Sequence, residues 1–93
     1  MYVGVLQFEL LMRDSQSLKD KRRVARSVKA RMRARYNVSV AEVDDQDVLQ
    51  SIVLGFAMAG SDSAQVVRTL EEITQHLRTH PEAELIAHEL DIL

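Results

Sequence analysis

The alternation of apolar and polar positions divides the chain into six segments. Residues that alternate in polarity predict four strands, at residues 2–12, 38–44, 48–59 and 83–92. Apolar residues that recur every three or four positions predict two helices, at residues 17–36 and 62–80. This order predicts an α+β, ferredoxin-like β-α-β-β-α-β fold, in which a four-stranded antiparallel sheet carries two helices on one face. No internal linker interrupts the pattern, so residues 1–93 are expected to form one domain.

The strand segments differ in how many of their faces are apolar. The first places Leu6, Phe8, Leu10 and Met12 on one face, which we expect to meet the helices. The third, residues 48–59, is apolar on both faces and is therefore expected to be central or covered on its second side. In the last segment, Ile86, Leu90 and Ile92 alternate with other residues, as in a strand. Residues 44–47 read as a polar hairpin turn.

Phe8 and Phe56 raise the question of base stacking, because many ferredoxin-like domains bind RNA through aromatic residues on the open sheet face. Each phenylalanine, however, alternates with aliphatic residues on its own face, and no basic RNP motif is present. The pattern therefore predicts that both rings lie in the core.

The predicted helix at residues 17–36 is strongly basic and amphipathic. It begins with a capping signal, Ser17 followed by Asp20. One stripe is apolar and should face the core: Leu18, Ala25, Val28, Met32 and Tyr36. Lys21 projects near this stripe, and we expect its ammonium group to snorkel to solvent.

A second face of this helix collects cations: Lys19, Arg22, Arg23, Arg26, Lys29 and Arg33. Charge runs are usually solvated surfaces, and that interpretation stays open. A solubilising helix, however, tends to alternate sign at i,i+4, whereas this one repeats positive charge, at about 0.2–0.5 kcal/mol of destabilisation per pair. A polyanion would convert that repulsion into binding free energy through counterion release.

The distribution of charge is more informative than the net charge of −2. Residues 13–35 contain ten basic and two acidic residues, whereas residues 37–93 contain two basic and eleven acidic ones. The molecule should therefore be strongly polarised. The absence of Cys fits a reducing compartment. No signal peptide or apolar run of about 20 residues occurs, so we expect a cytoplasmic protein that does not enter membranes.

Candidate catalytic and metal-binding residues are weak. His76 and His80 have a spacing that can hold zinc, but Leu77 stands where an HExxH motif needs glutamate. Asp44, Asp45 and Asp47 do not fit the glycine-containing calcium loop, and a solvated turn or a dock for a basic helix fits them better. No Ser nucleophile has a credible base partner. We expect no enzyme activity, catalytic residue, metal, cofactor or small-molecule substrate.

Three motifs resemble the bacterial YlxP-like family, domain of unknown function five-oh-three: YVGVL at residues 2–6, QSLKDKRR at 16–23 and YNVSVAEVD at 36–44. The resemblance covers essentially the whole chain. It implies a small cytoplasmic protein with a ferredoxin-like fold, encoded among translation and ribosome-assembly genes. RNA or the ribosome is then the implied partner, and the family supplies no catalytic residues.

Two functions follow from these observations. The first is a non-enzymatic RNA-binding or ribosome-associated accessory protein, whose nucleic-acid-binding residues would be Arg13, Lys19, Arg22, Arg23, Arg26, Lys29 and Arg33. The alternative is a homo-oligomeric interaction module, such as a homodimer, in which a second copy covers the sheet face that carries Val3, Val5, Val53 and Ala57. The basic helix would then meet Asp44, Asp45 and Asp47 of the other copy.

Overall fold

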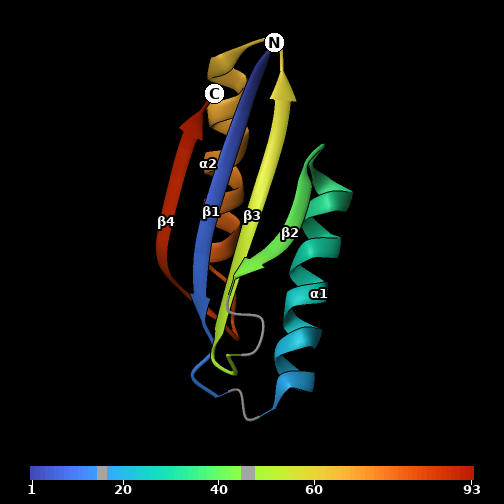
Figure 1. The fold of residues 1–93 in the computed structure, drawn as a ribbon, viewed down its shortest axis with the longest axis vertical. Helices are drawn as coiled ribbons and strands as arrows, with labels where there is room; N and C mark the ends of the chain where they lie inside the picture. The colour runs from blue at the N-terminus through green and yellow to red at the C-terminus, as the bar shows by residue number, and fades with distance from the viewer. Residues whose placement is uncertain (15–16, 45–47) are drawn as a thin grey trace.

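A computed structural model describes residues 1–14, 17–44 and 48–93. Its elements are β1 (Tyr2–Leu11), α1 (Leu18–Arg35), β2 (Ser39–Asp44), β3 (Ser51–Gly60), α2 (Ser63–Arg78) and β4 (Glu84–Ile92). The strands form one antiparallel sheet in the order β2-β3-β1-β4 (Figure 1). The predicted ferredoxin-like α+β fold is confirmed. The predicted turn residues 45–47 lie outside the described residues.

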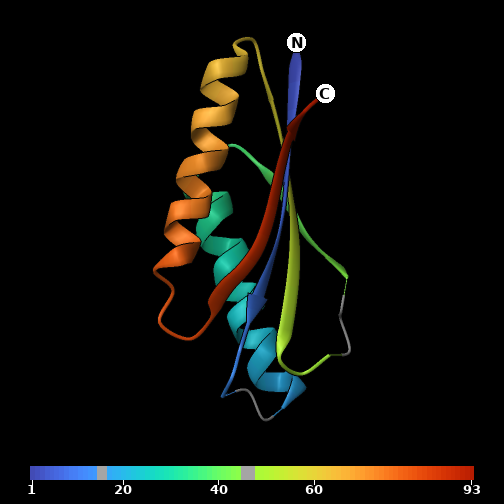
Figure 2. The same cartoon turned by 90° about the vertical axis from the view of Figure 1, so that its left-hand side faces the viewer.

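Both helices lie on the same face of the sheet (Figure 2). Side chains from this face of the strands and from both helices form one apolar core, with Leu6, Phe8, Leu54, Val28, Leu70 and Ile73 among its members. Fully burying each large apolar side chain contributes about 1.5–3 kcal/mol. The even-numbered residues of β1 and β3 thus lie under the helices. β3 pairs with β1 on one side and β2 on the other, and so it is central in the sheet, as predicted.

Gly4 sets the distance between β1 and α2. A Cβ atom at this position would lie 2.4 Å from Val66 Cγ1 and 2.6 Å from Leu70 Cδ1. Real Cβ atoms do not approach that closely, so the absence of a side chain at Gly4 lets α2 pack directly on the strand backbone. Neither α1 nor α2 is long and apolar enough to cross a membrane.

Two strand predictions were wrong in detail. β3 begins at Ser51 rather than at residue 48, and Val48 and Leu49 are 47% and 41% exposed just before it. In β4, the pairing with β1 shifts register between Glu9 and Leu10, so Leu85 pairs with Leu10 and Ile86 is 48% exposed. Beyond such a shift, the residues that would have pointed to one face of the sheet point to the other. Simple alternation along the sequence cannot predict this change.

The prediction for Lys21 was also wrong. Its side chain is buried rather than snorkelling, and Nζ lies 3.2 Å from Glu42 Oε1. Glu42 lies two residues after the buried Val40, on the helix-facing side of β2, just before a register shift with β3. This carboxylate gives the lysine a partner inside the fold, and so the ammonium group does not need to reach water.

Candidate nucleic-acid interface

The two phenylalanines lie inside the fold, as predicted. Phe8 and Phe56 are each 2% exposed, and their ring centroids lie 5.2 Å apart at an interplanar angle of 29°. They stack on each other beneath the helices. Neither ring is available to stack on a nucleic-acid base.

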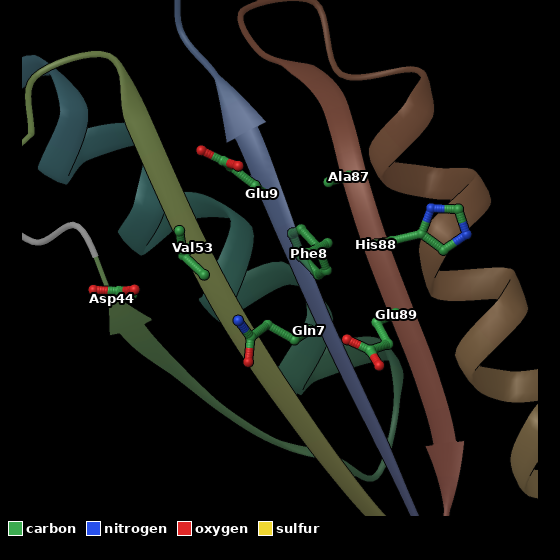
Figure 3. Close-up of a pocket in the computed structure, with 8 residues that line it drawn as sticks. All are labelled: Gln7, Phe8, Glu9, Asp44, Val53, Ala87, His88 and Glu89. Carbon is green, nitrogen blue, oxygen red and sulfur yellow. The ribbon is translucent and has the colours of Figure 1, made fainter.

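The outer face of the sheet is acidic. Glu9, Glu89 and Asp91 alternate with the core positions of β1 and β4, and Asp44 pairs with Val53 on the same face. Figure 3 shows Glu9, Asp44 and Glu89 around Gln7 and Val53, with His88 projecting away toward the side of α2. None of the four strands contains lysine or arginine. This face should repel phosphates, so an interface for a polyanion must lie elsewhere.

α1 is held in one orientation by its cap and its apolar stripe. Ser17 Oγ accepts a hydrogen bond from the Asp20 backbone N–H at 3.1 Å, which satisfies one of the free donors at the helix start. Val24, Ala25, Val28 and Met32 are buried against the rest of the core. This packing fixes the rotation of the helix and thereby turns its cationic positions toward solvent.

Four of these cations form an unpaired stripe on α1, which we call the α1 stripe: Lys19, Arg22, Arg26 and Lys29. The first three are exposed and Lys29 is partly buried. None of the four forms an ion pair with an acid that the structure describes. At 1.5 Å per residue the stripe spans about 15 Å of the helix axis. It is therefore a compact row of positive charge that no acid among the described residues neutralises.

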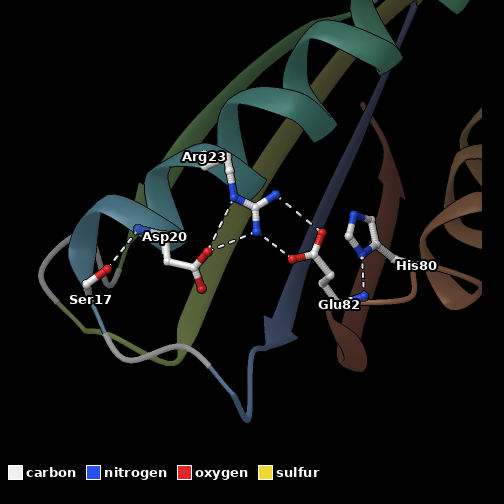
Figure 4. Close-up of polar contacts among 5 residues, drawn as sticks. All are labelled: Ser17, Asp20, Arg23, His80 and Glu82. Carbon is white, nitrogen blue, oxygen red and sulfur yellow. Dashed lines mark hydrogen bonds and ion pairs between the residues drawn. The ribbon is translucent and has the colours of Figure 1, made fainter.

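Arg23, by contrast, is bonded to acids of its own chain (Figure 4). Its Nη2 and Nε atoms donate to Asp20 Oδ1 at 2.9 and 3.3 Å, and Nη1 donates to Glu82 Oε1 at 3.3 Å. These contacts connect α1 to the segment between α2 and β4. The hydrogen bonds from Arg23 lower the pKa of Glu82, and those to Glu82 and Asp20 raise the pKa of Arg23. Arg23 thus has a structural role close to the α1 stripe.

Two other predicted site residues are also engaged. Arg13 Nη2 lies 3.0 Å from Glu84 Oε2, in an ion pair whose side chains are 70% and 56% exposed. Arg33 Nη2 donates to the backbone oxygen of Val40 at 2.6 Å, which connects the end of α1 to β2. An exposed pair such as Arg13–Glu84 contributes about 0–1 kcal/mol, so a phosphate could displace it at little cost.

The histidines have partners within the fold. His80 Nδ1 accepts a hydrogen bond from the Glu82 backbone N–H at 3.0 Å, and the His76 ring lies 6.1 Å from the Tyr36 ring in an edge-on contact. Burial, followed by the nearby positive charge of Arg31, lowers the pKa of His80. Among residues 1–14, 17–44 and 48–93, no group of three or more His, Asp or Glu side chains is arranged to hold a metal ion. Asp45 and Asp47 lie outside these ranges.

Sequence reasoning missed two features of the site. One is Glu82, which lies 59 residues from Arg23 and holds it in place. The other is the acidic outer face formed with Glu89 and Asp91. The acidic outer face could have been predicted, because none of the strand segments contains lysine or arginine. The contact between Glu82 and Arg23 could not, because no local sequence pattern indicates it.

Comparison with known proteins places the chain in a family. The model of the family described as "Protein of unknown function (DUF503)" matches residues 3–90. The "Uncharacterized protein YlxP" of Bacillus subtilis (strain 168) is 30% identical over 82 residues, which cover 88% of this chain and 89% of that protein. The match spans the whole fold, including α1 and the sheet. The chain therefore belongs to the DUF503 family, as the resemblance in its three motifs predicted.

Proposed function

We propose that this protein is a non-enzymatic RNA-binding or ribosome-associated accessory protein of the bacterial cytoplasm. The α1 stripe would contact phosphates, with Arg13, Arg23 and Arg33 close by. The observation that carries the proposal is the absence of any described acidic partner for Lys19, Arg22, Arg26 and Lys29. Arg13 and Arg23 pair with described acids at this end of the molecule, whereas the four residues of the α1 stripe pair with no described acid.

The energetics of the stripe favour a polyanionic partner. Lys19 and Arg22 are three residues apart, as are Arg26 and Lys29, and Arg22 and Arg26 are four apart. Such like-charged neighbours on a helix destabilise it by about 0.2–0.5 kcal/mol each. Phosphates would remove this repulsion and release counterions from the nucleic acid. The unliganded protein therefore carries a small cost that RNA binding would relieve.

The proposed contacts would position RNA without reading its sequence. Lysine and arginine on a helix flank bind phosphate oxygens, which are the same at every nucleotide. The buried positions of Phe8 and Phe56 remove the usual route to base recognition on this fold. We therefore propose a contact driven by shape and charge. The preference for RNA over DNA rests on the family resemblance, which points to translation and ribosome assembly.

A charge reversal within the α1 stripe tests this proposal. Arg22→Glu/Arg26→Glu should weaken binding to ribosomal RNA by more than tenfold in a fluorescence anisotropy titration, because it removes two phosphate contacts and adds repulsion. Arg68→Glu/Arg78→Glu on α2 is the matched control, since both side chains are exposed and the change in net charge is the same. Circular dichroism should report folded protein for both variants. Equal affinity of the stripe variant and the unmodified protein would contradict the proposal.

The homo-oligomeric alternative stays a prediction. No described element covers Val3, Val5 and Ala57 on the outer sheet face, which is what such a module would need, whereas Val53, also predicted for this surface, is buried within the chain. Two copies packed through this face would, however, oppose the carboxylates of one copy to those of the other. Sedimentation at micromolar concentration tests the alternative, and a monomer would count against it.

A further inference from the structure

A shallow hollow runs along the outer face of the sheet. Its floor is apolar and includes Val5, Ala41, Gly55 and Ala57, and Val43 lies at its β2 side. On the β4 side it is bounded by Glu89 and Asp91, which pair with Gln7 and Val5. A second hollow on the same face is lined by Glu9, Asp44 and Val53 and shares Gln7 and Glu89 with the first; Figure 3 shows its lining residues. Both helices lie on the other side of the sheet, so no described element covers it (Figure 2).

The hollow exists because the side chains of its floor are small. Gly55 and Ala57 of β3, paired with the small Ala41 and Ser39 of β2, present little volume beside Gln7 and Val5 of β1. A Cβ at Gly55 would lie 2.9 Å from Val43 Cγ1, so the glycine also lets Val43 lean over β3. The space above these small residues can accommodate larger apolar side chains of a bound partner.

The charges around the floor define the partner. Glu89 and Asp91 border the apolar floor on the β4 side, Glu9 and Asp44 lie on the same face beyond one end of it, and no lysine or arginine lies on any strand. A nucleic acid or an anionic membrane would be repelled. A second copy packed face to face would place like charges together, which costs several kcal/mol when they are closely juxtaposed. A cationic surface with apolar side chains is complementary to both features.

We propose that this hollow docks a basic amphipathic segment of a partner protein. Apolar side chains of the segment would lie over Val5, Gly55 and Ala57, and its lysines or arginines would face Glu89 and Asp91 along β4. This inference does not depend on RNA binding, because the α1 stripe belongs to the helical layer. A protein with both surfaces would bridge RNA and a basic protein.

The test uses the full chain and a short fluorescent peptide of alternating leucine and lysine. Binding is compared with two peptides of the same length, one of alternating serine and lysine and one of alternating leucine and glutamate. The variant is Glu89→Gln/Asp91→Asn, which neutralises two exposed carboxylates, and the control is Glu71→Gln/Glu72→Gln on α2. Backbone amide NMR shifts locate the bound peptide on the molecule.

We expect the leucine–lysine peptide to bind more tightly than either comparison peptide. The Glu89/Asp91 variant should bind it roughly 2- to 30-fold more weakly, as expected for the loss of two surface charge pairs, while the α2 control is unchanged. Amide shifts should concentrate on Val5, Gly55, Ala57 and their neighbours.

Three outcomes would overturn the inference. The first is an equal loss of affinity in the α2 control, which would indicate general attraction to an acidic chain. The second is a set of amide shifts on the helical layer instead of the outer sheet face. The third is a dimer in sedimentation that Ala57→Lys dissociates, which would make a second copy the occupant. Peptide binding that persists in the Arg22→Glu/Arg26→Glu variant would separate this inference from the proposed RNA function.

Discussion

Lys21 Nζ of α1 lies 3.2 Å from Glu42 Oε1 of β2, and the two side chains are 1% and 17% exposed. The pair is surrounded by apolar contacts between the helix and the sheet edge, where α1 packs on β2. A buried charge needs a partner, so only a limited set of rotations and translations of α1 satisfies Lys21. The pair therefore helps to define which face of α1 is turned outward, and with it the direction of the α1 stripe.

Removing one partner of this pair should be more harmful than removing both. Glu42→Ala leaves the ammonium of Lys21 buried and should lower the free energy of unfolding by about 3 kcal/mol. Lys21→Met/Glu42→Leu replaces both charges by apolar groups of similar length and should stay within about 1 kcal/mol of the unmodified protein. Urea unfolding of Lys21→Met, Glu42→Leu and the double variant gives the coupling free energy of the pair. If the double variant loses as much as the two singles added together, the residues do not act as a pair.

The close approach of α2 to β1 at Gly4 predicts a steric penalty. Gly4→Ala should destabilise the fold by about 1–3 kcal/mol, because its Cβ meets Val66 and Leu70 at impossible distances. Gly55→Ala is the matched control, since the atoms nearest to the added Cβ belong to Val43, which is half exposed and can move. Thermal unfolding compares the stability of Gly4→Ala with that of Gly55→Ala. Adding Val66→Ala to Gly4→Ala should restore part of the lost stability. Equal effects at both glycines would show that α2 does not set the constraint.

The contact between Arg23 and Glu82 predicts an acid-dependent loss of stability. Arg23 lowers the pKa of Glu82 below its ordinary value of 4.5. The contact therefore stabilises the fold above pH 4.5, and this stabilisation is lost as the pH falls through the folded-state pKa of Glu82. Arg23→Gln should therefore be less stable than the unmodified protein near neutral pH. This difference in the free energy of unfolding should become smaller when the pH is well below 4.5. Its NMR titration should show a higher pKa for Glu82.

Arg26→Gln serves as the control for this experiment, because Arg26 has no ion pair with a described acid. It should leave the titration of Glu82 unchanged. A Glu82 pKa that is the same in the Arg23 variant as in the unmodified protein would contradict the assignment.

His80 adds a second pH dependence at a higher pH. Burial and the charge of Arg31 lower its pKa below the ordinary 6.5, so the folded state binds a proton less readily than the unfolded chain. Stability should consequently decrease as pH falls below 6.5. Protonation would also remove Nδ1 as the acceptor for the Glu82 N–H. His80→Asn, which retains an acceptor without titrating, should flatten the stability profile in this range; an unchanged profile would exclude His80 as its source.

Most of the fold could be predicted because each helix or strand is specified by residues within it or next to it in the sequence. The alternation in β1 and β3, the apolar stripes of both helices and the caps at Ser17 and Asp62 all lie within a few residues of the structure that they specify. The register shift in β4 could not be predicted, because it depends on how Leu85 and Ile86 pair with β1 across the sheet. Alternation alone groups Ile86 with Leu90 and Ile92, whereas Ile86 lies half exposed and the other two pack against the core.

The site could be predicted only in outline for the same reason. The spacing in α1 identifies a basic face, but Glu84, which engages Arg13, and Glu82, which engages Arg23 together with the local Asp20, lie near the other end of the chain. Lys21 and Glu42 are likewise brought together by the packing of α1 on β2. The structure thus divides the predicted basic face into bonded residues and the α1 stripe, a division that follows from tertiary contacts.

The most direct test of the central claim is the salt dependence of binding to ribosomal RNA. Replacing Lys19, Arg22, Arg26 and Lys29 by glutamine removes all four charges of the α1 stripe, and Arg68→Gln/Arg78→Gln controls for charge lost from α2. In a plot of log affinity against log salt concentration, the slope should flatten by about 3 for the stripe variant, at roughly 0.7–0.9 per phosphate contact, and barely change for the control. A stripe variant with the slope and affinity of the unmodified protein would contradict the claim that α1 is the RNA-binding surface.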